Sequence, residues 1–219
     1  MNSPAKPIRY KTSKVKITSA EAKSAIYLDY EGNKDKEPTL LGWFVLGNYK
    51  AVIIEPLFAT CTDRYRAKGI YPEDHATLVL SLITQAEVEK RLIVSWSEHD
   101  FNHMAMVLKP DDIQRLLLVY RNAIRTARPW HQMKYGKLPG SATLDYFESL
   151  TGYVVPEKFG LGLVGNALRL IRRQIKEGRD YSGLSEKARV DWTKIVKHNR
   201  HDLIGMAHVL KFITSAAKA

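Results

Sequence analysis

Strand-like patterning is concentrated in the first half of the chain, where apolar and polar residues alternate or form short apolar runs. The segments with this pattern are 25–31, 39–47, 50–57 and 91–97. The last of these, "RLIVSWS", is largely apolar, as in central strands that are covered on both faces. Gly47 and Asn48 separate the second segment from the third, so we expect those two to pair as a hairpin.

Helical periodicity dominates elsewhere, over 76–90, over 111–128 and through most of the chain from residue 99 onward. Two late segments, "GLGLVGNALRLIRRQIKEG" and "KIVKHNRHDLIGMAHVLKFI", repeat apolar residues at helical spacing. Their predicted core stripes are Leu161, Val164, Leu168, Ile171 and Ile175 in the first, and Val196, Leu203, Met206, Leu210 and Ile213 in the second. Strands followed by helices, without an internal repeat or a linker, predict one α/β domain.

Residues 1–20 are polar and basic and include proline, so we expect a flexible basic arm before a domain over 21–219. The sequence contains no apolar run of about 18 residues, which a membrane span would need, and the Lys-rich N-terminus lacks the apolar core of a signal peptide. The single cysteine, Cys61, excludes an intrachain disulfide and a thiolate zinc site. These features predict a cytoplasmic protein without a membrane partner.

Positive charge is in excess, because 34 Lys and Arg residues against 23 Asp and Glu give a formal net charge of +11. Such an excess favours a polyanionic partner, above all nucleic acid, with an anionic membrane surface as the alternative. Two groups of basic residues cluster on predicted helices: Arg169, Arg172, Arg173 and Lys176, largely off their apolar stripe, and Arg121, Arg125 and Arg128. Each group is either a solvated helix face or a surface that binds the nucleic-acid backbone.

The stretch "AIYLDYEGN", residues 25–33, places two acids in an apolar and aromatic strand. Strand side chains alternate, so one face carries Ile26, Leu28 and Tyr30, and the other carries Tyr27, Asp29 and Glu31. Two like charges on a half-buried strand repel each other and lose hydration. The acidic pair therefore requires a compensating positive charge.

Two further acids and a histidine complete a candidate site. Asp100 follows the segment 91–97, where a helix begins, and Asp202 borders the apolar stripe of the last helix, with His198 one turn before it. Carboxylates from these elements can converge with the acidic pair, and a hard divalent cation would supply the missing charge. Two such cations bridged by carboxylates form a phosphoryl-transfer site.

Each of these features also has a purely structural interpretation. An Asp-x-Glu pair is common, Asp100 is typical of the first turn of a helix, and a lone histidine is most often a surface residue. The order and the placement of the features together favour the metal site.

Three other motifs match known patterns less well. "GLGLVG" at 160–165 matches the G-x-G-x-x-G dinucleotide-binding pattern but follows no clear strand, so helix packing explains it better. "HDFNH", from His99 to His103, resembles the H-E-x-x-H zinc helix, but a third ligand is not evident and Asp replaces the usual Glu. "HNRH" at 198–201 has the letters of an HNH nuclease without their separation along a ββα unit.

The segments "YLDYEGN", "WSEHDFNHM" and "HNRHDLIGM" resemble the three motifs of the DEDD 3′–5′ exonucleases. The similarity covers residues 24–214 and is greatest to the predicted ribonuclease H-like branch, in which a Tyr-Asn-x-x-Asp helix is typical. The resemblance implies a ribonuclease H-like fold and cleavage of nucleic-acid phosphodiesters. It also implies two Mg²⁺ or Mn²⁺ ions, held by Asp29, Glu31, Asp100 and Asp202.

His198 departs from the family pattern, because it occupies the place of the tyrosine, four residues before Asp202. The subclass with histidine places it five residues before the aspartate, where this chain has Lys197. An imidazole is a competent general base. The resemblance therefore implies His198 as the catalytic base and leaves the subclass open.

The predicted architecture is an α/β, ribonuclease H-like mixed sheet flanked by helices, with 25–31 at the centre and 91–97 parallel beside it. The fold requires a fifth strand, for which "TLDYF" at 143–147 is the candidate. The predicted function is a metal-dependent nuclease acting from a 3′ end on single-stranded DNA or RNA. The alternatives are a catalytically weak or inactive nucleic-acid-binding module or complex subunit, and a metal hydrolase with another substrate. The oligomeric state is open.

Overall fold

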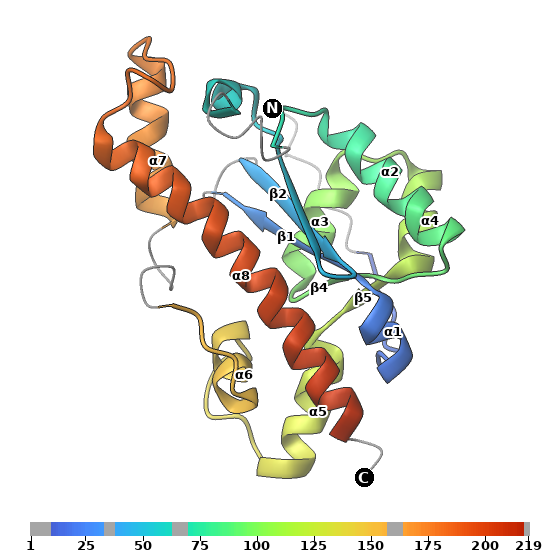
Figure 1. Cartoon of the computed structure of the whole chain (residues 1–219). Helices are drawn as coiled ribbons and strands as arrows, with labels where there is room; N and C mark the ends of the chain where they lie inside the picture. Colours follow the sequence, from blue (N-terminus) through green and yellow to red (C-terminus); the bar gives the residue numbers. More distant parts are fainter. Residues whose placement is uncertain (1–9, 33–37, 63–69, 157–163, 217–219) are drawn as a thin grey trace, which may run out of the picture.

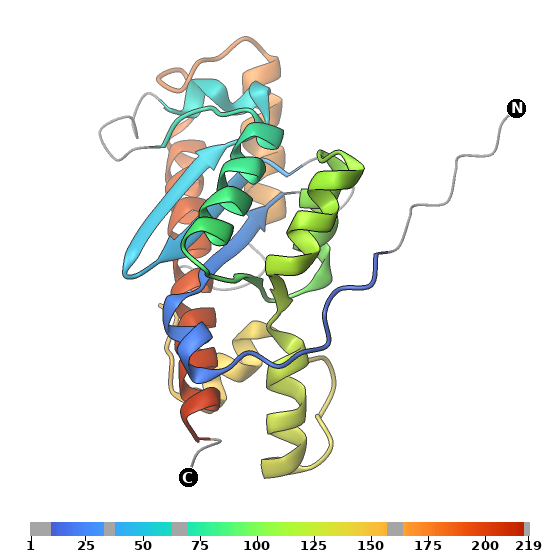
Figure 2. The same ribbon diagram turned by 90° about the vertical axis from the view of Figure 1, so that its right-hand side faces the viewer.

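The computed structural model describes residues 10–32, 38–62, 70–156 and 164–216. These residues form an α/β fold in which a five-stranded mixed sheet has helices on both faces (Figure 1, Figure 2). The strands are β1 (Ile26–Glu31), β2 (Leu40–Val45), β3 (Asn48–Ile53), β4 (Ile93–Ser95) and β5 (Tyr120–Asn122). The helices are α1 (Ser19–Ser24), α2 (His75–Val88), α3 (Glu98–Met106), α4 (Pro110–Val119), α5 (Ile124–Tyr135), α6 (Leu144–Thr151), α7 (Val164–Lys176) and α8 (Glu186–Ala216), with a 3-10 helix, η1, at Pro56–Thr62.

The strand order is β3-β2-β1-β4-β5, so the first strand lies at the centre of the sheet, as predicted. β1 pairs antiparallel with β2 and parallel with β4, which confirms the expected neighbour. β2 and β3 form the expected hairpin, but its two-residue turn is Leu46–Gly47, one residue earlier than predicted. Both turn residues have positive φ, 48° and 88°, which matches the twist of the flanking strands.

The two faces of β1 have the contents that strand alternation predicts. Ile26 and Leu28 are fully buried among residues of α2, α3 and α4, whereas Tyr27 packs on the opposite face with residues of α1, α5 and α8. Figure 1 shows α8 crossing this second face, with α2 and α4 on the other side of the sheet. Because they share the face of Tyr27, the acids Asp29 and Glu31 point towards α8.

α8 has 31 residues, which corresponds to about 46 Å at 1.5 Å per residue. The stripe predicted for it is confirmed, because each of these residues is at most 7% exposed: Val196, Leu203, Met206, Leu210 and Ile213. The helix lies directly over β2 at Gly42, where a Cβ atom would come within 1.7 Å of Asn199 Oδ1. The absence of a side chain at this strand position therefore lets α8 lie close to the sheet.

The fifth strand is not the segment that the sequence suggested. β5 pairs parallel with β4, and the candidate 143–147 is wrong because most of it lies in α6. A segment this short fits the period of either a strand or a helix. Gly152, at φ 80°, ends α6 in the left-handed conformation that glycine tolerates.

β5 also divides the predicted helix over 111–128 into α4 and α5, so that prediction is wrong. Tyr120 is fully buried, and its hydroxyl donates a hydrogen bond to the carbonyl of Ser97 over 2.9 Å. Aromatic residues such as Tyr120, the first residue of β5, favour strands. The backbone groups at the open edge of β4 pair with this short segment. If the helix continued instead, those groups of β4 would lose their partners.

The segment from residue 10 to residue 18 packs along the domain, which differs from the expected flexible arm (Figure 2). Thr12 and Ile17 are buried. Thr12 Oγ1 donates to Glu98 Oε1, and the Ile17 N–H donates to Thr126 Oγ1, each over 2.9 Å. α1 then begins at Ser19, within the range 1–20 assigned to the arm, and residues 1–9 lie outside the described residues.

Candidate metal centre

The four predicted acids are positioned by two neighbouring parallel strands and by α8. Asp29 and Glu31 are on β1, and Asp100 lies in the first turn of α3, shortly after β4. The carboxyl ends of parallel strands meet at one edge of a sheet, which brings these residues towards Asp202 on α8. Ser97, the N-cap of α3, donates from Oγ to Asp100 Oδ2 over 3.3 Å.

Glu31, His198 and Asp202 form a group of possible metal ligands. One ligand atom from each residue lies within 4.8 Å of the other two. Asp29 and Asp100 lie outside this trio but near its charges. Burial is the largest cause of the raised pKa of Asp29, and the charges of Glu31, Asp202 and Asp100 raise it further. The structure therefore brings all five predicted catalytic residues into one region, with three of them close enough to share an ion.

Burial and mutual repulsion raise the pKa values of these carboxyl groups. For Asp29 and Glu31, lost hydration is the largest cause of the raised pKa, followed by the charge of neighbouring acids. Burial also raises the pKa of Asp100, and it raises that of Asp202 to about 6 although His198 opposes this shift. Metal ligands must be deprotonated, so a bound cation would displace protons from these groups.

The donor set fits a hard divalent cation. Glu31 is only 6% exposed, yet its Oε1 has no hydrogen-bond partner among the described residues. A buried carboxylate oxygen without a hydrogen-bond donor has lost hydration without compensation. A bound cation would compensate for this loss. The ligands are carboxylate oxygens and one imidazole, and oxygen ligands suit Mg²⁺ and Mn²⁺. This acidic and histidine group can therefore hold a metal ion.

Asn199, on α8, holds Asp29 in place from within the core. Its fully buried side chain donates from Nδ2 to Asp29 Oδ2 over 2.9 Å and to the Asp29 carbonyl over 3.2 Å. The hydroxyl of Tyr49 donates to Asn199 Oδ1 over 3.1 Å and fixes the orientation of the amide. Asn199 is not among the predicted site residues, although the asparagine of the Tyr-Asn-x-x-Asp helix marks its position.

His198 and Asp202 lie one turn apart on α8, and His198 Nδ1 is 3.5 Å from Asp202 Oδ1. Their side chains are 13% and 25% exposed, so both remain accessible from outside. A neighbouring carboxylate orients an imidazole ring. The prediction that these two residues project from one helix face is confirmed.

Two further acids, which the sequence reasoning missed, come from α6. The charge of Asp145 raises the pKa of Asp202, and the pKa of Glu148 is raised to about 8, first by burial and then by Asp202. With His198 and Asp202, they line a cavity of about 410 Å³. On a helix, the Asp-x-x-Glu spacing places both acids on one face. The sequence suggested a strand over 143–147 instead, and in an extended chain residues three positions apart point in opposite directions.

Three of the four predicted backbone-binding residues on α7 face solvent: Arg169, Arg173 and Lys176. Arg172 is 5% exposed and binds Glu55 through two contacts, Nε to Oε1 at 3.1 Å and Nη2 to Oε2 at 2.6 Å. Its inclusion in a nucleic-acid surface is therefore wrong, because its charge is neutralised in the interior.

The second basic group is divided between two elements. Arg121 lies in β5, whereas Arg125 and Arg128 lie on α5, and Arg125 forms an ion pair with Glu98. Their clustering on a single helix is wrong, because the chain leaves helical geometry at Tyr120.

The zinc-like motif does bring two histidines together. His99 Nε2 and His103 Nε2, both on α3, lie 3.0 Å apart. Burial, and then the charges of His99 and His75, lower the pKa of His103 to about 4. Among the described residues, no third ligand completes a metal-binding group with this pair.

Most of the "GLGLVG" segment, positions 160–163, lies outside the described residues, and so does Leu161 of the predicted stripe. α7 begins at Val164, and Leu168 and Ile171 are fully buried, in agreement with the predicted stripe.

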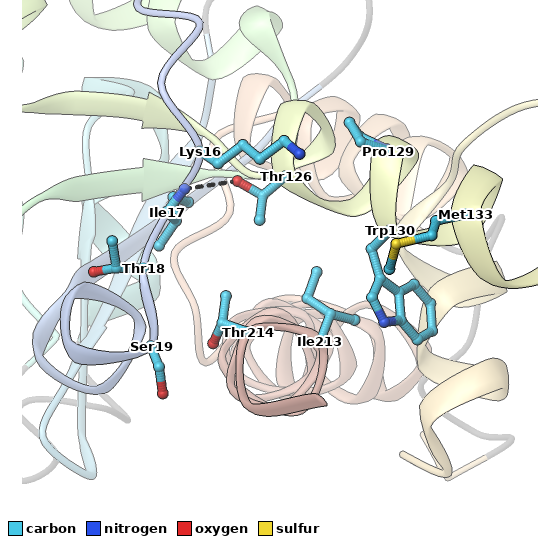
Figure 3. Close-up of a pocket in the computed structure, with 10 residues that line it drawn as sticks. All are labelled: Lys16, Ile17, Thr18, Ser19, Thr126, Pro129, Trp130, Met133, Ile213 and Thr214. Carbon is cyan, nitrogen blue, oxygen red and sulfur yellow. Dashed lines mark hydrogen bonds between the residues drawn. The ribbon is translucent and has the colours of Figure 1, made fainter. Parts of the chain in front are cut away.

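A second cavity, of about 290 Å³, lies near the C-terminal end of α8 (Figure 3). Figure 3 shows Trp130 and Met133 of α5 across the cavity from the N-terminal segment, where the Ile17 N–H binds Thr126 Oγ1. None of the ten lining residues is an acid or a histidine. This cavity therefore offers no chemistry comparable to that of the metal centre.

Comparisons with known proteins give no match: no family model matches the sequence, and neither curated proteins nor solved structures yield a significant one. Over the described parts of the chain, no helix combines the length and the apolar composition needed to cross a membrane.

Proposed function

We propose that the protein is a metal-dependent nuclease of the DEDD type with a ribonuclease H-like fold, which hydrolyses phosphodiester bonds from the 3′ end of single-stranded DNA or RNA. The observation that carries this proposal is the approach of Glu31, His198 and Asp202 within 4.8 Å of one another, with Asp29 and Asp100 beside them. Acids from three separate elements, of which Glu31 and Asp100 are buried, concentrate negative charge that a structural role alone does not require.

The sheet supports the same proposal. Its central first strand carries the acidic pair, and the parallel neighbour β4 leads into Asp100, in the arrangement that the resemblance implies. The third motif lies on α8, which packs across the same face. The three motif segments, which are distant in sequence, therefore meet at one edge of the sheet.

The chain supplies both the ligands and the groups that position them. Asp29, Glu31, Asp100 and Asp202 would hold one or two Mg²⁺ or Mn²⁺ ions, which when bound would stabilise negative charge on the scissile phosphate. Asn199 fixes the carboxylate of Asp29 through its 2.9 Å hydrogen bond.

His198 is the proposed general base, which takes a proton from the attacking water. Asp202, 3.5 Å from its Nδ1, orients the ring and stabilises the imidazolium that forms. The same imidazole is also close enough to Glu31 and Asp202 to ligate an ion. The two roles differ in one measurable respect: only the loss of a ligand weakens metal binding.

The test of the proposed function is incubation of the purified protein with single-stranded DNA and RNA, labelled at the 5′ or the 3′ end, in Mg²⁺, Mn²⁺ or EDTA. We expect 5′-labelled strands to shorten progressively in the presence of metal and to remain intact in EDTA. The variant Asp29→Asn, prepared in parallel, controls for contaminating nucleases. No cleavage with either metal, or equal cleavage by the variant, would overturn the proposal.

A second candidate function is a nucleic-acid-binding module without catalysis. The formal net charge of +11 and the exposed Arg169, Arg173 and Lys176 favour it. This function predicts binding that weakens with salt through counterion release, without cleavage in the same labelled strands.

A further inference from the structure

The two histidines of the "HDFNH" segment form a pair on α3 that the candidate metal centre does not use. His99 Nε2 and His103 Nε2 lie 3.0 Å apart, and the two rings meet edge to face with their centroids 4.4 Å apart. His99 is exposed and His103 is half-buried, so an ion in solvent can reach this pair. Side chains four residues apart lie on one face of a helix, and here they bring two imidazole nitrogens to one point of the surface.

The separation of these nitrogens is that of two ligands of one metal ion. Imidazole nitrogens bind metal ions at about 2.0–2.1 Å. Two such bonds at a right angle place the nitrogens about 2.8–3.0 Å apart, whereas a tetrahedral angle places them about 3.3–3.4 Å apart. The 3.0 Å distance between the Nε2 atoms therefore suits an ion with ligands at right angles, which Cu²⁺ and Ni²⁺ prefer.

Both imidazoles can present a lone pair to such an ion. A hydrogen bond joins the two Nε2 atoms, so one ring donates its proton to the lone pair of the other. The donor ring frees its own lone pair when it carries the proton on Nδ1 in place of Nε2, and neither ring then changes its charge. Burial is the largest cause of the low pKa of His103, about 4, which keeps this ring neutral at neutral pH.

Tyr30, on β1, supports the pair from the side of the sheet. Its ring packs against that of His103 with the centroids 5.3 Å apart, and its hydroxyl bonds His75 Nε2 over 2.7 Å. His75, at the start of α2, is thus engaged with Tyr30 and does not join the pair. Groups that orient the ligands are a regular part of metal sites. Two imidazoles would hold the ion, and water molecules would complete its coordination.

Asp100 takes no part in this pair, although it follows His99 directly in the sequence. Its carboxyl group is buried, accepts a hydrogen bond from Ser97 Oγ over 3.3 Å and acts on the charge of Asp29. In zinc enzymes with the H-E-x-x-H motif, the acid at this position is the general base. Here the acid belongs to the candidate metal centre, so the histidine pair is a site for binding without catalysis.

We propose that His99 and His103 bind a divalent transition-metal ion, with Cu²⁺ and Ni²⁺ as the best fit, at a site separate from the candidate metal centre. The two sites differ in their chemistry, because carboxylate oxygens suit hard cations and imidazole nitrogens suit transition metals. An ion at the pair joins the first turn of α3 to the second and stabilises the folded state. The inference goes beyond the proposed function, since it holds whether or not the protein cleaves nucleic acid.

The test is isothermal titration calorimetry with Ni²⁺ in an excess of Mg²⁺, which occupies the carboxylate ligands of the candidate metal centre. We expect the wild type to bind Ni²⁺, and His99→Ala and His103→Ala to bind it at least about tenfold more weakly, because even the loss of a group that orients a ligand costs about 10–100-fold. The control His208→Ala removes an imidazole that bonds the Thr151 carbonyl on α6, and it should keep the affinity of the wild type.

Three further measurements separate loss of the site from a folding defect and from binding elsewhere. Because His99 is exposed, His99→Ala should unfold in EDTA at the temperature of the wild type. Asp202→Asn, which lacks a ligand of the candidate metal centre, should bind Ni²⁺ as the wild type does. In NMR spectra of the wild type, a substoichiometric amount of paramagnetic Cu²⁺ should broaden the imidazole signals of His99 and His103 before those of His198.

No binding of Ni²⁺ by the wild type, or equal affinities in the wild type and His99→Ala, would overturn the site on α3. Broadening of His198 before the pair, or an equal loss of affinity in His208→Ala, would overturn it as well. Each of these results leaves the nuclease proposal standing, because the labelled strands in Mg²⁺ test that proposal separately.

Discussion

Asn199 Nδ2 donates a hydrogen bond to Asp29 Oδ2 over 2.9 Å, from a side chain with no exposed surface. The bond joins α8 to the central strand within the candidate metal centre. It lowers the pKa of Asp29, while burial and the neighbouring acids raise it. Asn199 is therefore a positioning residue that acts through the protonation and the orientation of Asp29.

Asn199→Ala should impair cleavage more at low pH than at high pH. Without the bond from Asn199, the pKa of Asp29 rises further, so the carboxylate needed to ligate an ion forms only at higher pH. The acid limb of the profile of kcat/KM against pH should therefore move to higher pH. Asn166→Ala, at an exposed position of α7, is the matched control and should leave the profile in place. An unshifted acid limb in Asn199→Ala would contradict a positioning role.

Asp202→Asn should abolish cleavage and raise the stability of the metal-free protein at pH 8. The pKa of Asp202 is raised to about 6 in the folded state, so folded chains bind a proton more tightly than unfolded ones. Its contribution to stability is present below the unfolded pKa of about 4 and is lost as pH rises through the folded value. Thermal unfolding in EDTA at pH 5 and pH 8 measures the difference, and about 1 kcal/mol corresponds to about 2–4 °C in Tm.

Metal addition provides the complementary measurement on the same variants. Mn²⁺ should raise the Tm of the wild type, because a ligand that binds only the folded state stabilises it. Asp29→Asn and Asp202→Asn should respond much less, while Glu186→Gln should respond like the wild type. Equal responses in all four proteins would show that these acids do not hold the ion.

His198→Ala should lower kcat by roughly 100-fold or more and leave substrate binding largely intact, because a general base acts in the transition state. His198→Tyr should retain part of the activity, since the spacing to Asp202 is that of the tyrosine subclass. Calorimetric titration with Mn²⁺ separates the two roles of this residue. Unchanged metal affinity with reduced turnover identifies a base, whereas weakened affinity identifies a ligand.

Charge reversal of Arg169 and Arg173 to Glu should weaken binding to single-stranded nucleic acid and reduce its dependence on salt, since fewer counterions are released. Both residues are exposed on α7, so the double variant should keep the stability of the wild type within about 0.5 kcal/mol. Fluorescence anisotropy at several salt concentrations measures the slope. Binding that is insensitive to salt and to these changes would return this surface to a solvated helix face.

Arg172→Ala should reduce the stability of the protein and leave nucleic-acid binding unchanged, in contrast to the charge reversal of Arg169 and Arg173. It leaves the 16% exposed side chain of Glu55 with the hydroxyl of Thr39 but without its cationic partner, and breaking a buried ion pair destabilises a protein by about 3–5 kcal/mol. Chemical denaturation should therefore show a large loss of stability. Any folded fraction should bind nucleic acid with the salt dependence of the wild type, since this guanidinium lies in the interior.

Properties of neighbouring residues in the sequence determined the first strand, the hairpin and the facing of the acids. Strand alternation alone places Asp29 and Glu31 on the face opposite Ile26 and Leu28, because the direction of a side chain on a strand is a local property. The four-residue spacing likewise places His198 and Asp202 on one side of a helix. Short-range geometry was sufficient for each of these predictions.

Tertiary structure decided which short segments became strands and which charges stayed at the surface. β5 has three residues, too few for a period to be recognised, and it forms because β4 offers an unpaired edge. α6 could be identified as a helix only through its packing on α8, and the position of Asp145 and Glu148 beside the same cavity as Asp202 follows from that packing. Whether such a short segment becomes a strand or a helix is decided only when it pairs or packs with a segment that is distant in the sequence.

The partners of two residues explain why the sequence could not assign their roles. Glu55 lies 117 positions before Arg172, and Asp29 lies 170 positions before Asn199. The pattern around each residue shows a basic helix face and a polar position beside an apolar stripe, and both are typical of solvated side chains. Burial and pairing depend on which distant group arrives opposite them, because the desolvation of a polar side chain is compensated only by the atoms it meets in the folded chain.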